Sequence, residues 1–333
     1  MATRWGIVGS GKISHDFVSA LKSLPCTEHE IVAVAARDES RAKEFARAHG
    51  IAKAFGSYEE LARDADIDIA YIGTLHTSHL EVGKMMLNAG KHVLCEKPLT
   101  MNLKQTKELI DLAKSKGLFL MEAIWSRCFP AYETLRKELD NKSIGEVKHV
   151  IASLGGKMPH VERLNRKELG GGTVLDLGVY VIQLVCLVLN HEKPTEIKTV
   201  GHTNDEGVDL SMSTSMTYSK GQTATIVTSS EVTLPNEAII IGTEGMIRIP
   251  DFWCPAKIIL PNGEVTVPLP KSDLNFNFKN SIGLSYEASE VRGCLKKGLK
   301  ESSKVAHDHS LLIASIQDEI RQQIGVVYDV DNS

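Results

Sequence analysis

The sequence predicts an α/β protein with a doubly wound parallel sheet first and an α+β region with a large open antiparallel sheet second. Over the first 122 residues, short apolar runs alternate with helical stretches, and a glycine-rich turn follows the first run. Beyond that point the chain changes to consecutive alternating strands joined by tight turns. The 333 residues, 42% of them hydrophobic, are enough for two domains, which we place at 1–122 and 123–333.

Strand and helix signals alternate in the first domain. The short apolar runs are typical of buried parallel strands and lie at Trp5–Val8, Ile31–Ala36, Ile69–Ile72, His92–Cys95 and Leu118–Met121. Helical stretches lie between and after them at Lys12–Leu24, Ser40–His49, Tyr58–Arg63, Ser78–Ala89 and Leu103–Lys116. This alternation predicts βαβ units and therefore a parallel sheet.

The second domain has a different pattern. Gly170–Leu189 is almost uniformly apolar, which predicts one buried helix. A strand at Val147–Leu154 precedes it, and further strands follow at Glu196–His202, Ser211–Tyr218, Thr223–Ser229, Ala238–Ile241, Met246–Ile249, Lys257–Leu260 and Val265–Val267. Tight turns such as Pro261–Glu264 join these strands, so we expect antiparallel pairing.

Charge and apolar length argue against two classes of partner. The net charge is −4 and no block of like charges occurs, so we expect neither a nucleic acid nor a membrane surface as partner. The most apolar stretch, Val179–Leu189, is shorter than the roughly 20 residues that span a bilayer. A small neutral or weakly charged molecule is the better candidate ligand.

The N-terminal segment and the cysteines indicate in which cellular compartment the protein is expected. The chain starts directly in a strand pattern, without the basic and long apolar segments of a signal peptide. The six cysteines form no Cys-x-x-Cys pair, and several fall in apolar runs. Buried reduced thiols are typical of a reducing compartment, so we expect a cytoplasmic protein.

The turn Gly9-Ser10-Gly11-Lys12-Ile13-Ser14 separates the first strand from an apolar helix. In Rossmann domains such a turn lets the backbone approach a pyrophosphate, which rests on the helix N-terminus. The third glycine of the motif is replaced here by a small serine, and a turn without a ligand is the alternative. We expect a dinucleotide in contact with Gly9, Gly11, Lys12 and Ile13.

Arg37 stands at the end of the second strand. An NAD site usually has an acidic residue there that binds the ribose hydroxyls, whereas an arginine accommodates a 2′-phosphate. Arg41 follows one helical turn later and could assist. We therefore expect NADP, while Asp38 beside Arg37 keeps NAD open.

Two histidines follow the fourth strand, at the sheet edge where ligands bind in such folds. We expect His76 and His79 to contact the cofactor together with Thr74, and Tyr71 to do so from the strand. The spacing of the histidines also permits a metal pair. No third or fourth ligand occurs at a matching spacing, so we expect no metal.

Lys97 leaves the carboxyl end of the fifth strand, on the same edge as the glycine turn. Exposure without function is the usual fate of a lysine, but a buried strand that leads to the cofactor edge favours a functional role. We expect Glu96 and Lys97 to contact the cofactor. Pro98 restricts the next bond, which could be cis.

Three polar residues interrupt the apolar segment Gly170–Leu189. Asp176, Tyr180 and Gln183 are spaced by four and three residues, which places them on one face of a continuous helix. A buried carboxylate and phenol each need a partner. A lysine from the first domain could be that partner, or the two side chains could form a purely structural hydrogen bond.

These motifs together resemble a known family. Gly6–Gly11, Glu96-Lys97-Pro98, and Gly171-Gly172 followed by Asp176 and Gly178 are similar to the glucose–fructose oxidoreductase/inositol dehydrogenase (Gfo/Idh/MocA) family over essentially the whole chain. Most members have an acid/base histidine where this chain has Tyr180, so the tyrosine points to one branch. Longer runs such as Gly117–Trp125 and Ser285–Ala288 are similar to that branch.

The resemblance implies oxidation of aromatic trans-dihydrodiols and of pentoses such as D-xylose, by hydride transfer to NADP. It also implies a homodimer formed through the C-terminal sheet. The substrate would be a neutral diol or cyclic sugar. Its expected contacts are Trp125, Arg127, Asp176, Tyr180 and Phe278. Other aromatic residues, Phe129, Trp253 and Phe276, are equally suited to pocket or core.

The resemblance assigns catalysis to Lys97 and Tyr180, with Asp176 as their neighbour. Tyr180 would exchange the hydroxyl proton and cationic Lys97 would stabilise the phenolate, because a free tyrosine ionises only near pH ~10. Asp176 would position Lys97 or the substrate. An NADPH-dependent reductase of sugars or dicarbonyls would use the same site. A nucleotide-binding sensor without catalysis is disfavoured because both catalytic residues are present.

Overall fold

The computed structural model describes residues 1–332, which divide into two compact units. Unit 1 consists of Met1–Thr100, Lys104–Cys128 and Leu269–His307, and unit 2 contains Met101–Leu103, Phe129–Pro268 and the chain from Asp308 onward. The predicted division at residue 122 therefore needs a correction. Leu269–His307 packs with the N-terminal part because η4 and α10 lie against α1, a contact that no local pattern encodes.

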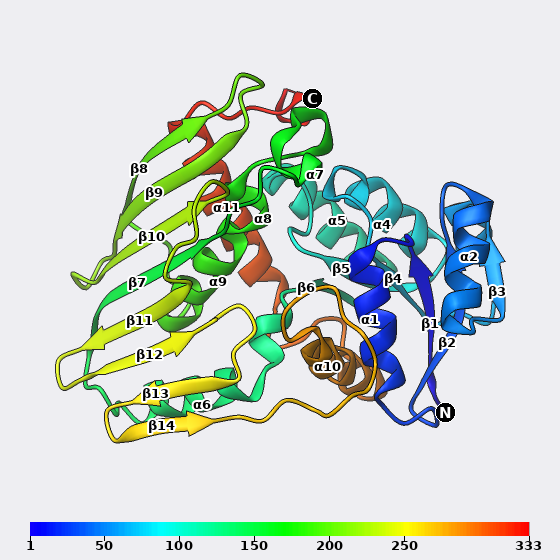
Figure 1. Ribbon diagram of the computed structural model, residues 1–333, viewed down its shortest axis with the longest axis horizontal. Coiled ribbons are helices and arrows are strands. Elements are labelled where there is room, and N and C mark those ends of the chain that lie inside the picture. The colour runs from blue at the N-terminus through cyan, green and yellow to red at the C-terminus, as the bar shows by residue number, and fades with distance from the viewer. Residues whose placement is uncertain (333) are drawn as a thin grey trace. The chain divides into compact units, whose positions relative to one another are not determined.

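Unit 1 contains the predicted parallel sheet. Within the described residues it has six strands in the order β3-β2-β1-β4-β5-β6, and all neighbouring strands pair in parallel (Figure 1). The strands are β1 Thr3–Val8, β2 His29–Ala35, β3 Lys53–Phe55, β4 Ile69–Ile72, β5 His92–Glu96 and β6 Leu120–Ala123. The strand order reverses between β1 and β4, which is where ligands bind in doubly wound sheets. The sequence pattern missed β3, which is too short to show a period.

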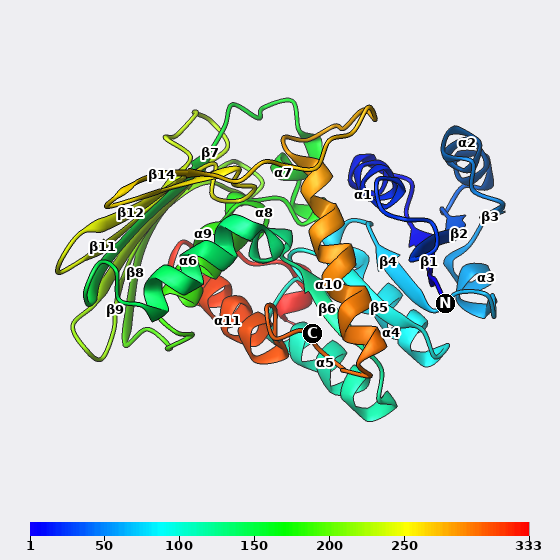
Figure 2. The ribbon, with the colours of Figure 1, turned by 90° about the horizontal axis from the view of Figure 1, so that it is seen from below.

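Helices cover both faces of this sheet. Figure 2 shows α1 and α2 on one side and α3, α4 and α5 on the other. The helices of unit 1 are α1 Lys12–Lys22, α2 Glu39–His49, α3 Tyr58–Arg63, α4 His79–Asn88, α5 Leu103–Lys116 and α10 Leu284–Lys296, with short 3-10 turns η1 His76–Ser78, η2 Trp125–Cys128 and η4 Ser281–Gly283. Side chains of β4 are buried throughout, as expected for a strand covered on both sides.

Unit 2 is built on a larger sheet. Among residues 1–332 it has eight strands in the order β14-β13-β12-β11-β7-β10-β9-β8. They are β7 Val147–Gly155, β8 Glu196–Thr203, β9 Asp209–Thr217, β10 Thr223–Ser229, β11 Glu237–Gly242, β12 Met246–Pro250, β13 Lys257–Leu260 and β14 Gly263–Thr266. The predicted hairpin at Pro261 joins β13 to β14.

The second sheet is mixed, which corrects the prediction of an antiparallel sheet. β7 and β10 pair in parallel, with His149 opposite Thr223. A parallel neighbour requires a crossover connection, and the chain between these strands contains the helices α7 to α9. The other pairs of neighbouring strands in the described sheet are antiparallel, as expected from the tight turns.

Helices cover one face of the second sheet. Figure 2 shows α6, α9 and α11 on that face. The helices are α6 Pro130–Asp140, α7 Glu162–Asn165, α8 Thr173–Asp176, α9 Gly178–Val188 and α11 His307–Gln323, with 3-10 turns η3 Lys167–Leu169 and η5 Asp329–Asp331. The stretch Lys167–Val188 is long and apolar enough to cross a membrane, but its most apolar window is completely buried, as in a core helix.

Candidate active site

The glycine turn between β1 and α1 has the geometry that an anion site needs. Gly9 has a φ of 101°, and a Cβ at this position would come within 2.9 Å of the carbonyl oxygen of Gly73. Gly11 is the N-cap of α1, and no side chain caps this end of the helix. First-turn N–H groups without a side-chain acceptor bind anions readily. The turn therefore fits the pyrophosphate of a dinucleotide, and Lys12 is exposed beside it.

Ser14 replaces the third glycine of the motif without preventing close packing. The side chain is completely buried, and its hydroxyl has no hydrogen-bond partner among the described residues. A Cβ on Gly73 would overlap this hydroxyl. Gly73 follows β4 and brings its backbone close to α1, a role that the sequence motif did not reveal. Ile13 is half-buried in the same turn.

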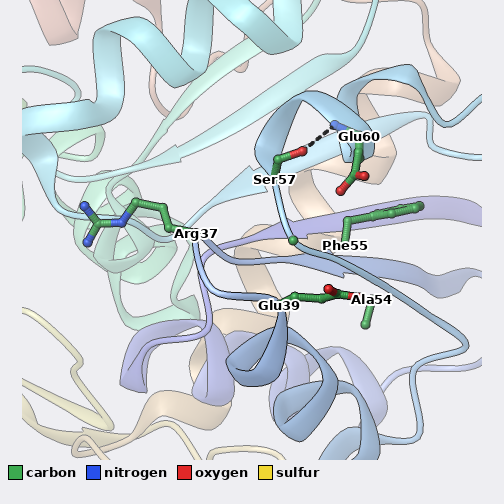
Figure 3. Close-up of a pocket in the computed structure, with 7 residues that line it drawn as sticks. Arg37, Glu39, Ala54, Phe55, Ser57 and Glu60 are labelled. Carbon is green, nitrogen blue, oxygen red and sulfur yellow. Dashed lines mark hydrogen bonds between the residues drawn. The ribbon is translucent and has the colours of Figure 1, made fainter.

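An open pocket of about 480 Å³ adjoins the end of β2 (Figure 3). Figure 3 shows the Arg37 guanidinium extending away from Glu39 and Glu60, the two acidic side chains of the pocket. Glu39 forms an ion pair with Lys43 at 2.7 Å. The pocket is lined by Arg37, Glu39, Ala54, Phe55, Gly56, Ser57 and Glu60. Arg37 is exposed at its mouth, where it could meet a charged ligand.

Asp38 has a structural role in this region. Its carboxylate accepts hydrogen bonds from the backbone N–H of Ser40 at 2.8 Å and from the Ser40 hydroxyl at 2.7 Å. The Ser40 hydroxyl is the main cause of a lowered pKa at Asp38. Asp38 therefore caps α2 through Oδ1. The charges of Arg37 and Arg41 both act on Tyr58, although burial dominates and raises the pKa of that phenol.

His79 links two loops at the edge of the sheet. Its Nδ1 lies 3.0 Å from the carbonyl oxygen of Pro98, and its Nε2 lies 3.2 Å from that of Thr74. Burial lowers the pKa of this imidazole to about 4, so the ring is neutral near pH 7. These contacts give His79 a supporting role behind the cofactor edge. His76 is also buried, and among residues 1–332 no group of three or more His, Cys, Asp or Glu side chains could hold a metal.

Glu96 and Tyr71 support the chain that carries Lys97. The Tyr71 hydroxyl donates to Glu96 Oε1 at 2.7 Å, and the backbone N–H of Lys97 donates to Glu96 Oε2 at 3.3 Å. The Tyr71 ring is completely buried and stacks on Phe17 with 3.8 Å between centroids. Tyr71 is therefore a core residue beneath the edge. Lys97 is half-buried, and its bond to Pro98 is cis.

A second buried carboxyl group, that of Glu287 on α10, lies near Glu96. Glu287 is completely buried, and neither of its oxygens has a hydrogen-bond partner among the described residues. Burial, and then the charge of Glu96, raise the pKa of Glu287 well above its ordinary value. The buried site and the nearby Glu96 carboxylate therefore favour the neutral form of Glu287. No periodic pattern or motif singles out Glu287, because its neighbour Glu96 is 191 positions away in the chain.

Asp176 is held by an arginine of its own unit. Arg163 Nη1 and Nη2 donate to the two Asp176 oxygens at 2.9 and 3.2 Å, a bidentate pair. Arg163 belongs to α7, and no sequence spacing indicated the pairing. The carboxylate is buried and ends α8.

Asp176 and Tyr180 do not lie on one continuous helix, which corrects the prediction. Leu177 separates α8 from α9 with φ −100° and ψ −35°. The third polar residue, Gln183, is completely buried and donates to the Tyr132 hydroxyl at 2.8 Å. Gln183 is therefore a core residue of unit 2. Tyr180 is buried near the start of α9.

The predicted substrate contacts are divided between the units. Trp125 and Arg127 lie on η2 of unit 1, where Arg127 Nη1 donates to the carbonyl oxygen of Lys304 at 3.4 Å. Phe278 also belongs to unit 1 and is 45% exposed. Asp176 and Tyr180 belong to unit 2. The pairing of Lys97 with Tyr180 thus joins two separately described units and stays a prediction.

Family models match most of the chain. Residues 3–124 match the model described as "Oxidoreductase family, NAD-binding Rossmann fold". Residues 132–248 match the "GFO/IDH/MocA C-terminal domain".

Several relatives that match along the whole chain share one name. The chain is 48% identical to trans-1,2-dihydrobenzene-1,2-diol dehydrogenase of Danio rerio, with 100% of both chains covered. It is 43% identical to the Homo sapiens protein of that name, with 99% of both chains covered.

Solved structures show the same architecture. A 3-ketoreductase from Actinomadura kijaniata in complex with NADP and TDP-benzene is 26% identical, with a TM-score of 0.80 over 97% of this chain and 98% of that one. Levoglucosan dehydrogenase, in complex with NADH and levoglucosan, has a TM-score of 0.84 over 98% of each chain and, at 20% identity, supports the fold alone. The glycine turn fits the cofactor class that these folds bind. The chain belongs to the Gfo/Idh/MocA oxidoreductase family and is an NAD(P)-binding oxidoreductase.

Proposed function

We propose that the protein is an NADP-dependent dehydrogenase that oxidises trans-dihydrodiols of aromatic hydrocarbons, and pentoses such as D-xylose. The observation that carries the proposal is 43–49% identity along the whole chain to proteins named trans-1,2-dihydrobenzene-1,2-diol dehydrogenase. Purified protein is mixed with NADP+ and benzene dihydrodiol, D-xylose or D-glucose, and NADPH is followed by absorbance. Turnover of none of them contradicts the substrate assignment.

The preference for NADP is supported by the pocket at the end of β2. Arg37 offers a guanidinium at its mouth, and the Asp38 carboxylate is engaged with Ser40. A 2′-phosphate would form charge-assisted hydrogen bonds with Arg37, and Arg41 would add positive charge.

The cofactor preference is tested with Arg37→Ala. We expect the Kd for NADPH to rise at least about tenfold, equivalent to about 1.4 kcal/mol, while the Kd for NADH changes little. Arg47→Ala, at an exposed position of α2, the helix that follows Arg37, serves as the control. Equal weakening for both cofactors would contradict recognition of the 2′-phosphate by Arg37.

The proposed chemistry removes a hydride and a proton from a carbinol. A bound nicotinamide would supply the hydride acceptor for the carbinol carbon. Tyr180 takes the hydroxyl proton as the carbonyl forms, and the Lys97 ammonium stabilises the phenolate. Asp176, fixed by Arg163, orients the substrate hydroxyl or the lysine.

The roles are tested with Tyr180→Phe. We expect kcat to fall by about 10²–10⁴, the usual contribution of general acid–base catalysis, while the Kd for NADPH is unchanged. Tyr218→Phe removes another buried phenol of unit 2 and should keep wild-type turnover. Wild-type kcat in Tyr180→Phe would contradict the assignment.

A reductase working in the opposite direction is the second candidate. The A. kijaniata relative is named as a 3-ketoreductase and is 26% identical. Oxidation of NADPH with keto sugars and dicarbonyls, compared as kcat/KM with diol oxidation, distinguishes the two directions. A catalytically inactive nucleotide sensor would bind NADPH and turn over none of these substrates.

We also propose a homodimer formed through the second sheet. The face opposite the helices carries a row of side chains that are only partly covered, in which Ile151 pairs with Ile239 and Thr225. Ile151 is 36% exposed. Light scattering should give twice 36.5 kDa for the wild type, and Ile151→Glu should shift it to the monomer. Leu299→Glu, exposed on unit 1, is the control, and a monomeric wild type contradicts the proposal.

A cytoplasmic location is supported by the thiols. Cys26 is exposed, the other five cysteines are buried, and none forms a disulfide in the described chain. Fractionation of cells that express the tagged protein tests the location, and recovery from the secreted fraction contradicts it.

A further inference from the structure

The chain between β14 and η4 forms a strap, residues 269–280, that belongs to unit 1. Most of its residues are exposed and none lies in a helix or strand. In Figure 1 it is the yellow-orange loop that leads into α10, and five hydrogen bonds described below attach it to α1. The strap is therefore ordered by contacts more than 250 residues away in sequence.

Asp16 is the main attachment of the strap. Its carboxylate is completely buried on α1, one turn beyond the glycine turn. Oδ1 accepts hydrogen bonds from the backbone N–H and the side-chain amide of Asn277, both at 2.8 Å, and Oδ2 accepts from the backbone N–H of Phe278 at 2.9 Å. A buried carboxylate requires such partners. All three come from the strap, so burial of Asp16 and ordering of the strap depend on each other.

Further contacts extend the attachment along α1. The side-chain amide of Asn277 also donates to the carbonyl oxygen of Lys12 at 3.3 Å. His15 Nε2 lies 3.1 Å from the carbonyl oxygen of Asn275, which can only accept, so the proton resides on Nε2. His15 Nδ1 then accepts from His49 Nε2 at 3.0 Å.

The strap reaches the end of α1 that faces the cofactor. Lys12 is the first residue of α1 and directly follows the turn whose N–H groups fit a pyrophosphate. Beyond the Asn277 contact, Phe276 and Phe278 line a small cavity of about 210 Å³ on the strap. Phe278 remains 45% exposed, although an aromatic ring is usually covered. The exposed ring and the glycine turn are thus held on the same end of one helix.

We propose that Asp16 is a positioning residue of the cofactor site: it clamps the strap at the first turn of α1 and so retains the bound dinucleotide. The proposal rests on the NAD(P)-binding function of this fold. In the wild type, the strap covers one side of the glycine turn as long as its hydrogen bonds to Asp16 are formed. Loss of the clamp lets the strap open, and the cofactor leaves faster.

The test compares Asp16→Asn with Asp273→Asn in the full-length protein. Asp16→Asn keeps the shape but replaces a charged acceptor by an amide, whereas Asp273 is an exposed acid of the same strap. NADPH dissociation is measured by stopped-flow fluorescence. We expect Asp16→Asn to raise the dissociation rate at least about tenfold, because most differences in affinity appear in the dissociation rate, and Asp273→Asn to leave it unchanged.

Hydrogen exchange reports the strap directly. In the wild type, NADPH should slow exchange at residues 271–280, and this protection should disappear in Asp16→Asn. Asn277→Ala removes only the side-chain contacts and should raise the dissociation rate about threefold, which keeps the test available if Asp16→Asn does not fold.

Two results would overturn the clamp. In one, Asp16→Asn exchanges faster at the strap but releases NADPH at the wild-type rate. In the other, Asn277→Ala behaves like Asp273→Asn. A wild-type chain that binds neither NADPH nor NADH would instead contradict the cofactor assignment itself.

Discussion

The chain contains two glycine-rich turns that lead into helices, and only one of them is open to a ligand. In unit 1, Gly11 precedes α1 and no side chain caps the helix. In unit 2, Gly172 precedes α8, and the buried Asp209 carboxylate accepts from the backbone N–H of Val174 at 2.8 Å and from the Thr173 hydroxyl at 2.7 Å. The N-terminal N–H groups of α1 remain available to a ligand. Those of α8 are already bound by a carboxylate of the protein itself.

The two turns show that a glycine motif alone does not define an anion site. The position of a carboxylate from elsewhere in the chain decides whether the N–H groups remain available. The second turn is closed further by Tyr328, whose hydroxyl donates to the carbonyl oxygen of Gly171. Variants that place a side chain in the open turn, or that remove the carboxylate from the closed one, test this explanation.

The largest effect is expected for Gly172→Ala. Gly172 has a φ of 118°, and a Cβ there would overlap the Asp209 carboxylate. Backbone strain and overlap together should lower the free energy of unfolding by about 3–5 kcal/mol in a urea titration. Gly207→Ala has a comparable φ of 75° but no neighbour within 4 Å, so it should cost only about 1 kcal/mol. Equal losses in the two variants would rule out the overlap as the cause.

Acid should act on unit 1 through His79 and through two further histidines, His29 and His49, because burial lowers the pKa of each of the three to about 4. The pKa of His79 is about 4 in the folded protein, below the ordinary value of 6.5, so the unfolded chain takes up the proton first. The free energy of unfolding should therefore fall as the pH drops from about 6.5 to 4, by up to about 3 kcal/mol from this residue. At unit 2 the sign is opposite, because burial raises the pKa of Asp209.

The His79 prediction is measured as the slope of unfolding free energy against pH. His79→Asn should reduce the slope between pH ~4 and ~6.5, whatever its absolute stability, and the remaining slope is that of His29 and His49. His160→Asn, at an exposed position of unit 2, should leave the slope as in the wild type. An unchanged slope in His79→Asn would show that this imidazole is not an acid-sensitive group.

Removal of the internal cap should have a smaller effect. Asp209→Ala leaves the buried Thr173 hydroxyl and the Val174 N–H without this acceptor, which should lower the free energy of unfolding by about 2 kcal/mol. Asp209→Asn keeps an acceptor oxygen and should cost less. Asp205→Ala, an exposed acid before β9, is the control for thermal and urea unfolding. If both alanine variants lose the same stability, the cap is not what holds the second turn.

Filling the open turn should have the smallest free-energy effect. Gly11→Asp places a carboxylate at the N-cap of α1, where the backbone is extended and a Cβ would have its nearest neighbour 4.0 Å away. Unfolding should change by only a few tenths of a kcal/mol, while the Kd for NADPH should rise about tenfold through competition and repulsion at the helix end. Gly11→Ala tests the side chain without the charge. Unaltered binding in Gly11→Asp would place the pyrophosphate elsewhere.

Local patterns predicted the parallel sheet well. Alternating apolar runs and glycine stops located most strands and helices of unit 1, because those signals depend on nearest neighbours. The break at Leu177 and the parallel β7–β10 pair were missed, since both depend on tertiary packing.

For the site, the sequence predicts which residues to consider but not which side chains contact one another. The position on a sheet edge is the reason why the glycine turn, Arg37 and Lys97 are predicted as site residues, and these roles stay predictions. That position could not show that Arg163 holds Asp176, that Glu287 lies near Glu96, or that Tyr71 and His79 serve as supports. Those contacts join residues without a fixed sequence spacing, so no periodic pattern records them.

Unit 1 is discontinuous, and this has a consequence for how the protein is made. A ribosome completes residues 1–128 well before it reaches Leu269–His307, the segment that supplies α10 and the partners of Asp16. During synthesis, α1 of the nucleotide-binding region therefore stays without its covering helix α10 until the whole second sheet has been synthesised. A gene fragment that stops near residue 128 would lack these covering elements, so unit 1 is complete only when the whole chain up to His307 is expressed.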